Sequence, residues 1–202
     1  MSGPDYYNTI DQEGKAEFSD RGSRFIAYAC PIRDQSEFRN RLEELKKEHP
    51  KATHHCFAYR IGLDRNEYRA NDDGEPSGTA GKPILGQIDS RALTNVLVVV
   101  VRYFGGTQLG VPGLIHAYRT ASSLVLQSLP LIRKPVEIPL EIEFDYDTLN
   151  RIMLVVKQFQ CSIKERDIQL DSRMLMGVPK DRLDEVQLRL KKIRGVKALR
   201  TH

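Results

Sequence analysis

The chain has 202 residues, of which 40% are hydrophobic and 29% are charged, and its formal net charge is +4. These values are typical of a globular protein, and the apolar run Val96–Val101 is far shorter than the roughly 18 residues of a membrane span. The acidic, polar N-terminus lacks the regions of a secretory signal, and three separated cysteines suit a reducing compartment. We therefore expect a cytoplasmic protein that is not bound to a membrane.

Strands and helices alternate over the first two thirds of the chain. A helix over 34–48 is predicted because Asp34 or Ser36 can cap it, because Phe38 and Leu42 share one face, and because the residue before Pro50 disfavours the helical region. The other predicted elements are strands over 16–18, 24–32, 54–62, 67–70 and 95–104 and helices over 83–89 and 111–129. We expect the strand over 95–104 to be central, since it is the most apolar.

A proline-flanked connector, Pro130–Pro135, precedes a second pattern. The expected elements are strands over 136–144, 161–170, 173–178 and 196–201 and helices over 147–159 and 180–193. This is the β-α-β-β-α-β order of a ferredoxin-like domain. The sequence therefore predicts a two-layer α+β or α/β fold with domains at 1–132 and 136–202.

The acidic and glycine-rich segment Asn71–Gly81 is the first candidate site. Its carboxylates at Asp72, Asp73 and Glu75 suit a hard cation or a general base, but they also suit an acidic turn whose Ser77 and Thr79 cap the following helix. Ser77 could act as a nucleophile, but the chain lacks the GxSxG elbow. The choice between recognition, chemistry and a structural turn is open.

A second candidate is the loop Gly105–Gly110, which lies between an apolar strand and a helix. Glycines and free N–H groups at a helix start suit a phosphate or carboxylate, although a tight connection needs the same residues. The loop lacks the Lys-Ser/Thr of a P-loop and does not read GxGxxG. The run His54-His55-Cys56 alternates between faces of a strand, so we expect no metal site and no cofactor.

Basic and aromatic side chains flank both segments. If Arg24, Lys82, Arg102 and Arg119 converge, they form a positive cleft to which aromatic residues add stacking surfaces, and this combination suits RNA or nucleotides. The stacking candidates are Tyr103, Phe104 and Tyr118. The alternative is that Arg102 and Arg119 pair with the nearby carboxylates. The full set of candidate ligand-binding residues is Arg24, Asp72, Asp73, Glu75, Ser77, Thr79, Lys82, Arg102, Tyr103, Gly105, Gly106 and Arg119.

The C-terminal segment from Arg189 onward is basic and contains no acid. It is a candidate nucleic-acid contact through Lys191, Lys192 and Arg194. The alternative is a solvated helix end whose positive charge the helix dipole favours.

Four segments carry a resemblance to a known family. They are RGSRF (Arg21–Phe25), THHCFAYRIG (Thr53–Gly62), NDDGEPSGTAGKPIL (Asn71–Leu85) and VVVVRYFGGTQLGVPGLIHAY (Val98–Tyr118). They resemble the IMPACT family over about residues 14–130, and the whole chain resembles its bacterial YigZ-type members, which have two domains. One departure is Pro112, which stands where the family usually has glycine in LGxGGL. Proline removes an N–H that an anion site would use, but it is neutral at the start of a helix.

The resemblance implies an N-terminal domain like domain IV of elongation factor G, a C-terminal ferredoxin-like domain like its domain V, and a role around translation. We therefore expect a translation-associated regulatory protein without enzymatic activity that binds RNA or a surface of the ribosome or a translation factor. One alternative is an enzyme that acts on a small phosphorylated or peptide substrate at the two motifs. Another is a docking module that exposes Tyr103 and Phe104.

Overall fold

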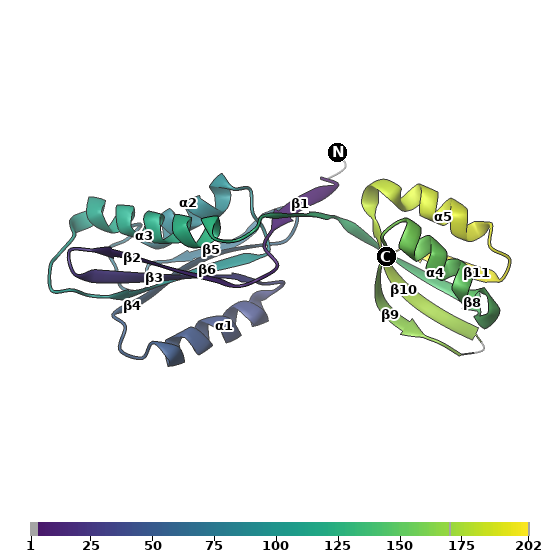
Figure 1. Cartoon of the computed structure of the whole chain (residues 1–202), viewed down its shortest axis with the longest axis horizontal. Coiled ribbons are helices and arrows are strands. Elements are labelled where there is room, and N and C mark those ends of the chain that lie inside the picture. Colours follow the sequence, from purple (N-terminus) through teal and green to yellow (C-terminus); the bar gives the residue numbers. More distant parts are fainter. Residues whose placement is uncertain (1–3, 170, 202) are drawn as a thin grey trace. The chain divides into compact units, whose positions relative to one another are not determined.

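The structure, a computed structural model, describes residues 4–169 and 171–201, which form two compact units (Figure 1). The first unit is Tyr7–Lys134, and the second contains residues 4–6 and 135–201. The strands β1 (Tyr6–Thr9) and β7 (Ile132–Pro135) pair as a two-stranded sheet. No helix in the described part of the chain has both the length and the hydropathy needed to cross a membrane.

A five-stranded sheet with helices on both faces forms the first unit. In chain order its elements are β2 (Gly14–Asp20), β3 (Ser23–Pro31), α1 (Gln35–Glu48), β4 (His54–Ile61), β5 (Glu67–Asn71), α2 (Gly81–Ser90), β6 (Val96–Tyr103) and α3 (Gly110–Gln127). The strand order is β2-β3-β6-β4-β5, and every pairing is antiparallel. The predicted central strand is therefore confirmed as β6.

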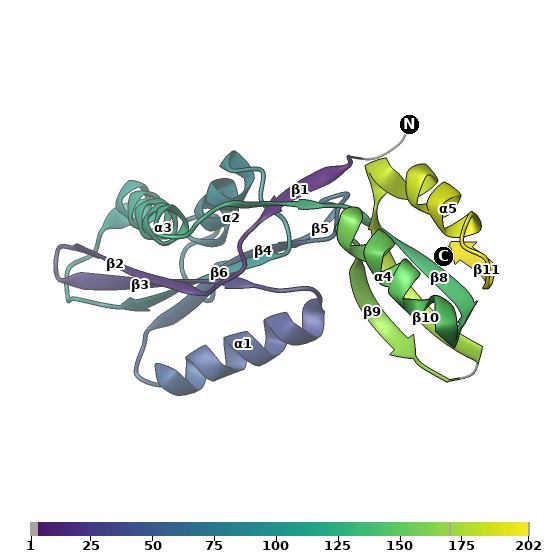
Figure 2. The ribbon, with the colours of Figure 1, turned by 45° about the vertical axis from the view of Figure 1, so that its right-hand side comes forward.

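The expected two-layer arrangement is wrong for this unit, which has three layers. Figure 2 shows α1 on one face of the sheet and α2 and α3 on the other. Each face has its own apolar cluster: Val98 and Val100 of β6 belong to the cluster under α2 and α3, and Leu97 and Val99 belong to the cluster under α1. Because β6 is apolar on both faces, burial of both faces requires helices on both sides.

The start of α1 follows from the sequence. The Asp34 carboxylate accepts hydrogen bonds from the backbone N–H groups of Ser36 (2.7 Å) and Glu37 (3.0 Å). Phe38 and Leu45 are buried, and Phe38 packs on Phe57 and Tyr59 of β4 with ring centroids 4.9 and 4.7 Å apart. An N-terminal cap and one apolar stripe are thus enough to place this helix on the sheet.

The second unit has the predicted order of elements. They are β8 (Glu137–Asp145), a 3₁₀ turn (Tyr146–Thr148), α4 (Leu149–Gln158), β9 (Ser162–Asp167), β10 (Asp171–Pro179), a 3₁₀ turn (Lys180–Arg182), α5 (Leu183–Lys191) and β11 (Val196–Thr201). The sheet order is β11-β8-β10-β9. Alternate residues of β8 (Leu140, Ile142 and Phe144) join the helices in one apolar cluster. The strand predicted over 161–170 is shorter than expected, and Leu170 lies outside the described residues.

Candidate functional site

A buried cluster of polar side chains connects the two motifs of the first unit. Glu75 Oε1 accepts hydrogen bonds from Arg102 Nη1 and from the Tyr118 hydroxyl, both at 2.7 Å. The exposed fractions of the Glu75 and Arg102 side chains are 3% and 6%, and Tyr118 is fully buried. The loss of either partner of this ion pair would leave the other charge buried without compensation, which strongly destabilises a folded protein.

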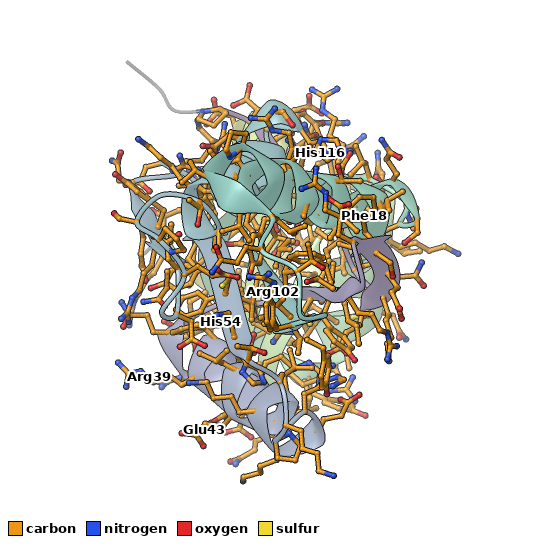
Figure 3. The ribbon with its side chains drawn as sticks, turned by 90° about the vertical axis from the view of Figure 1, so that its left-hand side faces the viewer. Phe18, Arg39, Glu43, His54, Arg102 and His116 are labelled. Carbon is orange, nitrogen blue, oxygen red and sulfur yellow. The ribbon has the colours of Figure 1, made fainter. Side chains whose placement is uncertain are left out.

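The sheet register and one helix bring these groups together. His54 on β4 is the cross-strand partner of Arg102 on β6, and Figure 3 shows the two side chains near each other. His54 Nε2 lies 3.9 Å from Glu75 Oε1. The thiol of Cys56, two residues along β4, lies 3.3 Å from the Tyr118 hydroxyl and 3.0 Å from the carbonyl oxygen of Asp72. Two strands, one helix and one loop therefore meet at Glu75.

Asp72 caps the helix that follows its loop. Its carboxylate accepts N–H groups from Gly78 (2.8 Å), Ala80 (3.0 Å) and Gly81 (2.8 Å). Burial alone would raise the pKa of this carboxyl, but the three N–H donors outweigh burial and hold the pKa below its ordinary value. The N–H groups of Ala80 and Gly81 at the start of α2 are therefore already used by an internal carboxylate.

The prediction that Ser77 and Thr79 cap this helix is wrong. The Thr79 hydroxyl donates to the carbonyl oxygen of Pro76 at 2.7 Å, and Ser77 is exposed. The reason is geometric: the loop folds back, so the carboxylate of Asp72 reaches the N–H of Ala80, eight residues later in the chain, at 3.0 Å.

Asp73 binds the loop to β4. Its carboxylate accepts the backbone N–H of His55 at 2.6 Å, and its carbonyl oxygen lies 2.7 Å from His54 Nδ1. Its φ is +42°, a left-handed conformation that aspartate tolerates better than most residues. His55 is buried, and this burial lowers the pKa of its imidazole. The three acids of the motif therefore have separate structural partners.

Gly105 makes a close backbone contact. A Cβ at this position would lie 2.0 Å from the carbonyl carbon of Gly22 in the turn between β2 and β3. The Gly105 N–H donates to Ser23 Oγ at 3.2 Å, and the Phe104 N–H donates to Thr53 Oγ1 at the same distance. The start of the loop is thus attached to two neighbouring segments, whereas Gly106 has φ +86° and no atom within 4 Å of its ideal Cβ.

This arrangement suits a rigid frame better than a catalytic centre. The frame consists of the residues that these contacts join, which are Ser23, Thr53, His54, His55, Cys56, Asp72, Asp73, Glu75, Arg102, Gly105 and Tyr118. Burial raises the pKa of the Cys56 thiol and of the Tyr118 hydroxyl, so neither group is an activated nucleophile or base. Glu75 and Asp72 are occupied by internal donors. In the described part of the chain, no three His, Cys, Asp or Glu side chains are arranged to hold a metal ion.

Several predicted members of a positive cleft do not join this cluster. Arg24 pairs with Glu17 at 2.8 Å on the surface, and Lys82 and Arg119 are exposed. Tyr118 is fully buried, so its predicted role as a stacking surface is wrong. Tyr103 is half-buried, with its hydroxyl 2.8 Å from His49 Nδ1.

The frame presents apolar and aromatic groups to solvent. Phe104 is 49% exposed and Val111 at the start of α3 is 51% exposed. The Arg102 guanidinium carbon lies 5.5 Å from the centroid of the Phe104 ring. The alternative in which this loop exposes an apolar epitope therefore has a structural basis at Phe104.

The basic segment of the second unit lies at the end of α5. Lys191, Lys192 and Arg194 are exposed, and no ion pair involves them in the described part of the chain. Lys197 and Arg200, by contrast, pair with Asp145 (2.8 Å) and Glu143 (3.7 Å). The three exposed cations next to the negative end of the helix are thus available to an anionic partner.

Sequence reasoning missed two residues of the frame. Ser23 hydrogen-bonds Gly105 and lies 3.4 Å from Arg102 Nη2, and Thr53 hydrogen-bonds Phe104. Both residues stand within segments that the resemblance had already marked: Ser23 is the central residue of RGSRF, and Thr53 is the first residue of THHCFAYRIG. That position was the available signal, because a small hydroxyl residue has no periodicity that would reveal its role.

Comparison with known proteins assigns the chain to a family. Residues 21–126 match the family model described as the Impact N-terminal domain. The IMPACT family member YvyE of Bacillus subtilis is 37% identical over 79% of this chain and 73% of its own length. The IMPACT family member YigZ of Escherichia coli is 32% identical over 83% of both chains. A crystal structure described as that of a hypothetical protein is similar over 98% of this chain and 97% of its own, with a TM-score of 0.75 and 29% identity. The chain belongs to the IMPACT family.

Proposed function

We propose that this protein is a translation-associated regulatory protein without enzymatic activity, and that it acts by binding RNA or a surface of the ribosome or of a translation factor. Membership of the IMPACT family supports the role around translation. The order of elements in the second unit supports the ferredoxin-like assignment and the analogy with domain V of elongation factor G, and the analogy of the first unit with domain IV belongs to the same proposal.

The observation that carries the RNA part of the proposal is the group of cations at the end of α5. Lys191, Lys192 and Arg194 are exposed and form no ion pair in the described part of the chain. Phosphate groups that neutralise such cations release counterions, so binding weakens as salt increases. A cytoplasmic location is part of this proposal.

The test is co-sedimentation of the purified protein with ribosomes, and with RNA extracted from them, over a salt series. The variant in which Lys191, Lys192 and Arg194 are all alanine should bind less tightly, and the slope of log affinity against log salt should fall by about 0.7 for each lost contact with single-stranded RNA. Unchanged affinity and slope would refute the proposed surface.

The matched control removes the same net charge from the same unit. Lys164, Arg173 and Arg182 each pair with a glutamate, at 2.6, 3.3 and 2.9 Å. Their triple alanine variant should retain the affinity of the unmodified protein. If both triple variants lose affinity equally, the effect reflects net charge and not this surface.

A second candidate function is protein docking at the frame, and the exposure of Phe104 favours it. Phe104→Ala should then weaken binding of a translation factor without changing the binding of naked RNA. The enzyme alternative has less support, because internal donors already occupy the carboxylates of Asp72 and Glu75. A screen of phosphorylated metabolites and short peptides for turnover would reverse that judgement if it found a substrate.

A further inference from the structure

An open groove lies on the first unit between α1 and the end of its sheet. It encloses about 340 Å³. From α1 it is lined by Phe38, Arg39, Leu42, Glu43 and Lys46, and from β4, β5 and the following loop by Phe57, Arg69, Asn71 and Asp73. None of these residues belongs to the basic segment on which the proposed function rests, and only Asp73 belongs to the frame.

The groove exists because the apolar face of the sheet ends at β4. On the face that α1 covers, β4 carries Phe57, Tyr59 and Ile61, which are buried. Their cross-strand partners on β5 are Asn71, Arg69 and Glu67, which are polar. Helix α1 packs on β4 through Phe38, whereas the residues of β5 are mostly exposed.

The strand β5 is an edge of the sheet, and its outer side has unused backbone groups. It is the last strand in the order β2-β3-β6-β4-β5. Among the residues that the structure describes, no hydrogen bond outside the ladder with β4 uses the backbone of residues 67–71. Such an edge offers N–H and C=O groups to a further strand.

The dimensions of the groove suit an extended chain. From Phe38 to Lys46, α1 rises by about 12 Å at about 1.5 Å per residue. An extended polypeptide of about four residues has the same length at about 3.3 Å per residue. A hydrogen bond of 3.0 Å from Gln35 Nε2 to Glu67 Oε1 joins the first residue of α1 to the first residue of β5.

The charges in the groove favour an acidic segment. Arg39, Lys46 and Arg69 form no ion pair in the described part of the chain, and Arg69 lies over the ring of Phe57 with 5.7 Å to its centroid. The two acids that line the groove are Glu43 and Asp73, and the carboxylate of Asp73 accepts the backbone N–H of His55. Figure 3 shows Arg39 and Glu43 on α1, on the opposite side of the view from Phe18. Three cations and two acids therefore line the groove, and this balance favours an acidic segment.

The same observations argue against a nucleic acid in this groove. The aromatic residues Phe38 and Phe57 are only 4% and 5% exposed, so their rings are not available as stacking platforms for bases. A strand edge, in contrast, is complementary to a polypeptide backbone. We infer that this groove binds an extended acidic segment of a partner protein, which adds to the sheet beside β5.

The experiment uses the full chain and a library of random dodecapeptides displayed on phage. Selected peptides should be enriched in acidic residues, and synthetic copies should bind in fluorescence anisotropy. Arg69→Glu and Lys46→Glu should each raise the Kd by about tenfold or more, since each reverses a charge that faces the peptide. Bound peptide should slow hydrogen exchange of the amides in β5.

The matched control is Lys47→Glu, which makes the same charge change on the neighbouring residue of α1, outside the groove. It should leave the Kd unchanged within about twofold, as expected for a charge outside the contact. The inference would be overturned if the selection enriched no peptide. It would also be overturned if the enriched peptides bound Arg69→Glu and Lys46→Glu as tightly as they bind the unmodified chain. A third outcome against the inference is that the unmodified chain dimerises with increasing concentration, or binds RNA, and that Lys46→Glu abolishes this association while Lys47→Glu does not.

These outcomes are distinct from those of the proposed function. Loss of ribosome binding depends on the triple variant at Lys191, Lys192 and Arg194, whereas loss of peptide binding depends on Arg69 and Lys46. Either result can fail while the other holds.

Discussion

Replacement of Glu75 by alanine should strongly destabilise the first unit. The change leaves the guanidinium of Arg102, whose side chain is 6% exposed, without a carboxylate, and it removes the acceptor of the buried Tyr118 hydroxyl. Removal of one partner of a buried ion pair costs roughly 3–5 kcal/mol. Because domains are stable by only about 5–15 kcal/mol, the unit should approach its unfolding threshold.

Glu75→Gln separates the charge from the hydrogen bonds. Glutamine keeps the volume and one acceptor oxygen, so the expected cost is about 1.5–3 kcal/mol, which is typical of a hydrogen bond to a charged group. The chain has no tryptophan. Hydrogen exchange of the β6 amides, which lie in the centre of the sheet, therefore provides the assay, and a loss of 3 kcal/mol makes that exchange about 100-fold faster.

A second Arg–Glu pair on the surface of the same unit serves as the control. Arg24 and Glu17 form a pair at 2.8 Å, and their side chains are 54% and 43% exposed. Solvent screens such a pair, so Glu17→Ala should cost about 0–1 kcal/mol. If Glu75→Ala costs no more than Glu17→Ala, then the buried cluster does not hold the two motifs together, and the reasoning is refuted.

Three further predictions concern the loops and the thiols. Asp72→Asn should destabilise the protein by about 1–3 kcal/mol. Because the pKa of Asp72 is lowered in the folded protein, the difference in the free energy of unfolding between the two proteins should be largest above about pH 4 and should shrink as the pH falls further. Urea unfolding at pH 7 and pH 3 would measure this difference. Gly105→Ala should cost about 1–3 kcal/mol of stability or displace the loop, since the added Cβ would overlap the backbone of Gly22. Gly106→Ala should cost about 1 kcal/mol, because only its positive φ opposes a side chain. Equal unfolding midpoints of the two variants would contradict the contact between Gly105 and Gly22. Iodoacetamide should modify Cys161 before Cys56, because Cys161 is half-buried and Cys56 is fully buried. Burial raises the pKa of the Cys161 thiol to about 11, so its reaction should itself be slow. If mass spectrometry found the reverse order, the buried cluster around Glu75 would have to open.

Local sequence rules predicted most elements of both units, but they did not predict the strands β1 and β7. The cap and apolar stripe of α1, the apolar run of β6 and the β-α-β-β-α-β order of the second unit all follow from patterns within about 15 residues. The number of layers was predicted wrongly, although the continuous apolar run of β6 is typical of a strand that is buried on both faces.

The motifs were recognisable in the sequence, but the partners of their residues were not. Asp72 was a candidate ligand by composition, yet it caps a helix because the loop folds back on itself. Arg24 and Arg102 looked equivalent in sequence, but the sheet register directs one to a surface glutamate and the other to the buried Glu75.

The amino-acid sequence was sufficient to indicate the family, most of the elements and the location of the candidate segments, since these depend on residue types and short-range spacing. The fold was needed to show that Tyr118 is buried, that Gly105 contacts the turn at Gly22, and that β5 is an edge strand. Each of these facts depends on which distant segments the sheet register and the helix packing bring into contact, and a local sequence pattern does not encode that pairing.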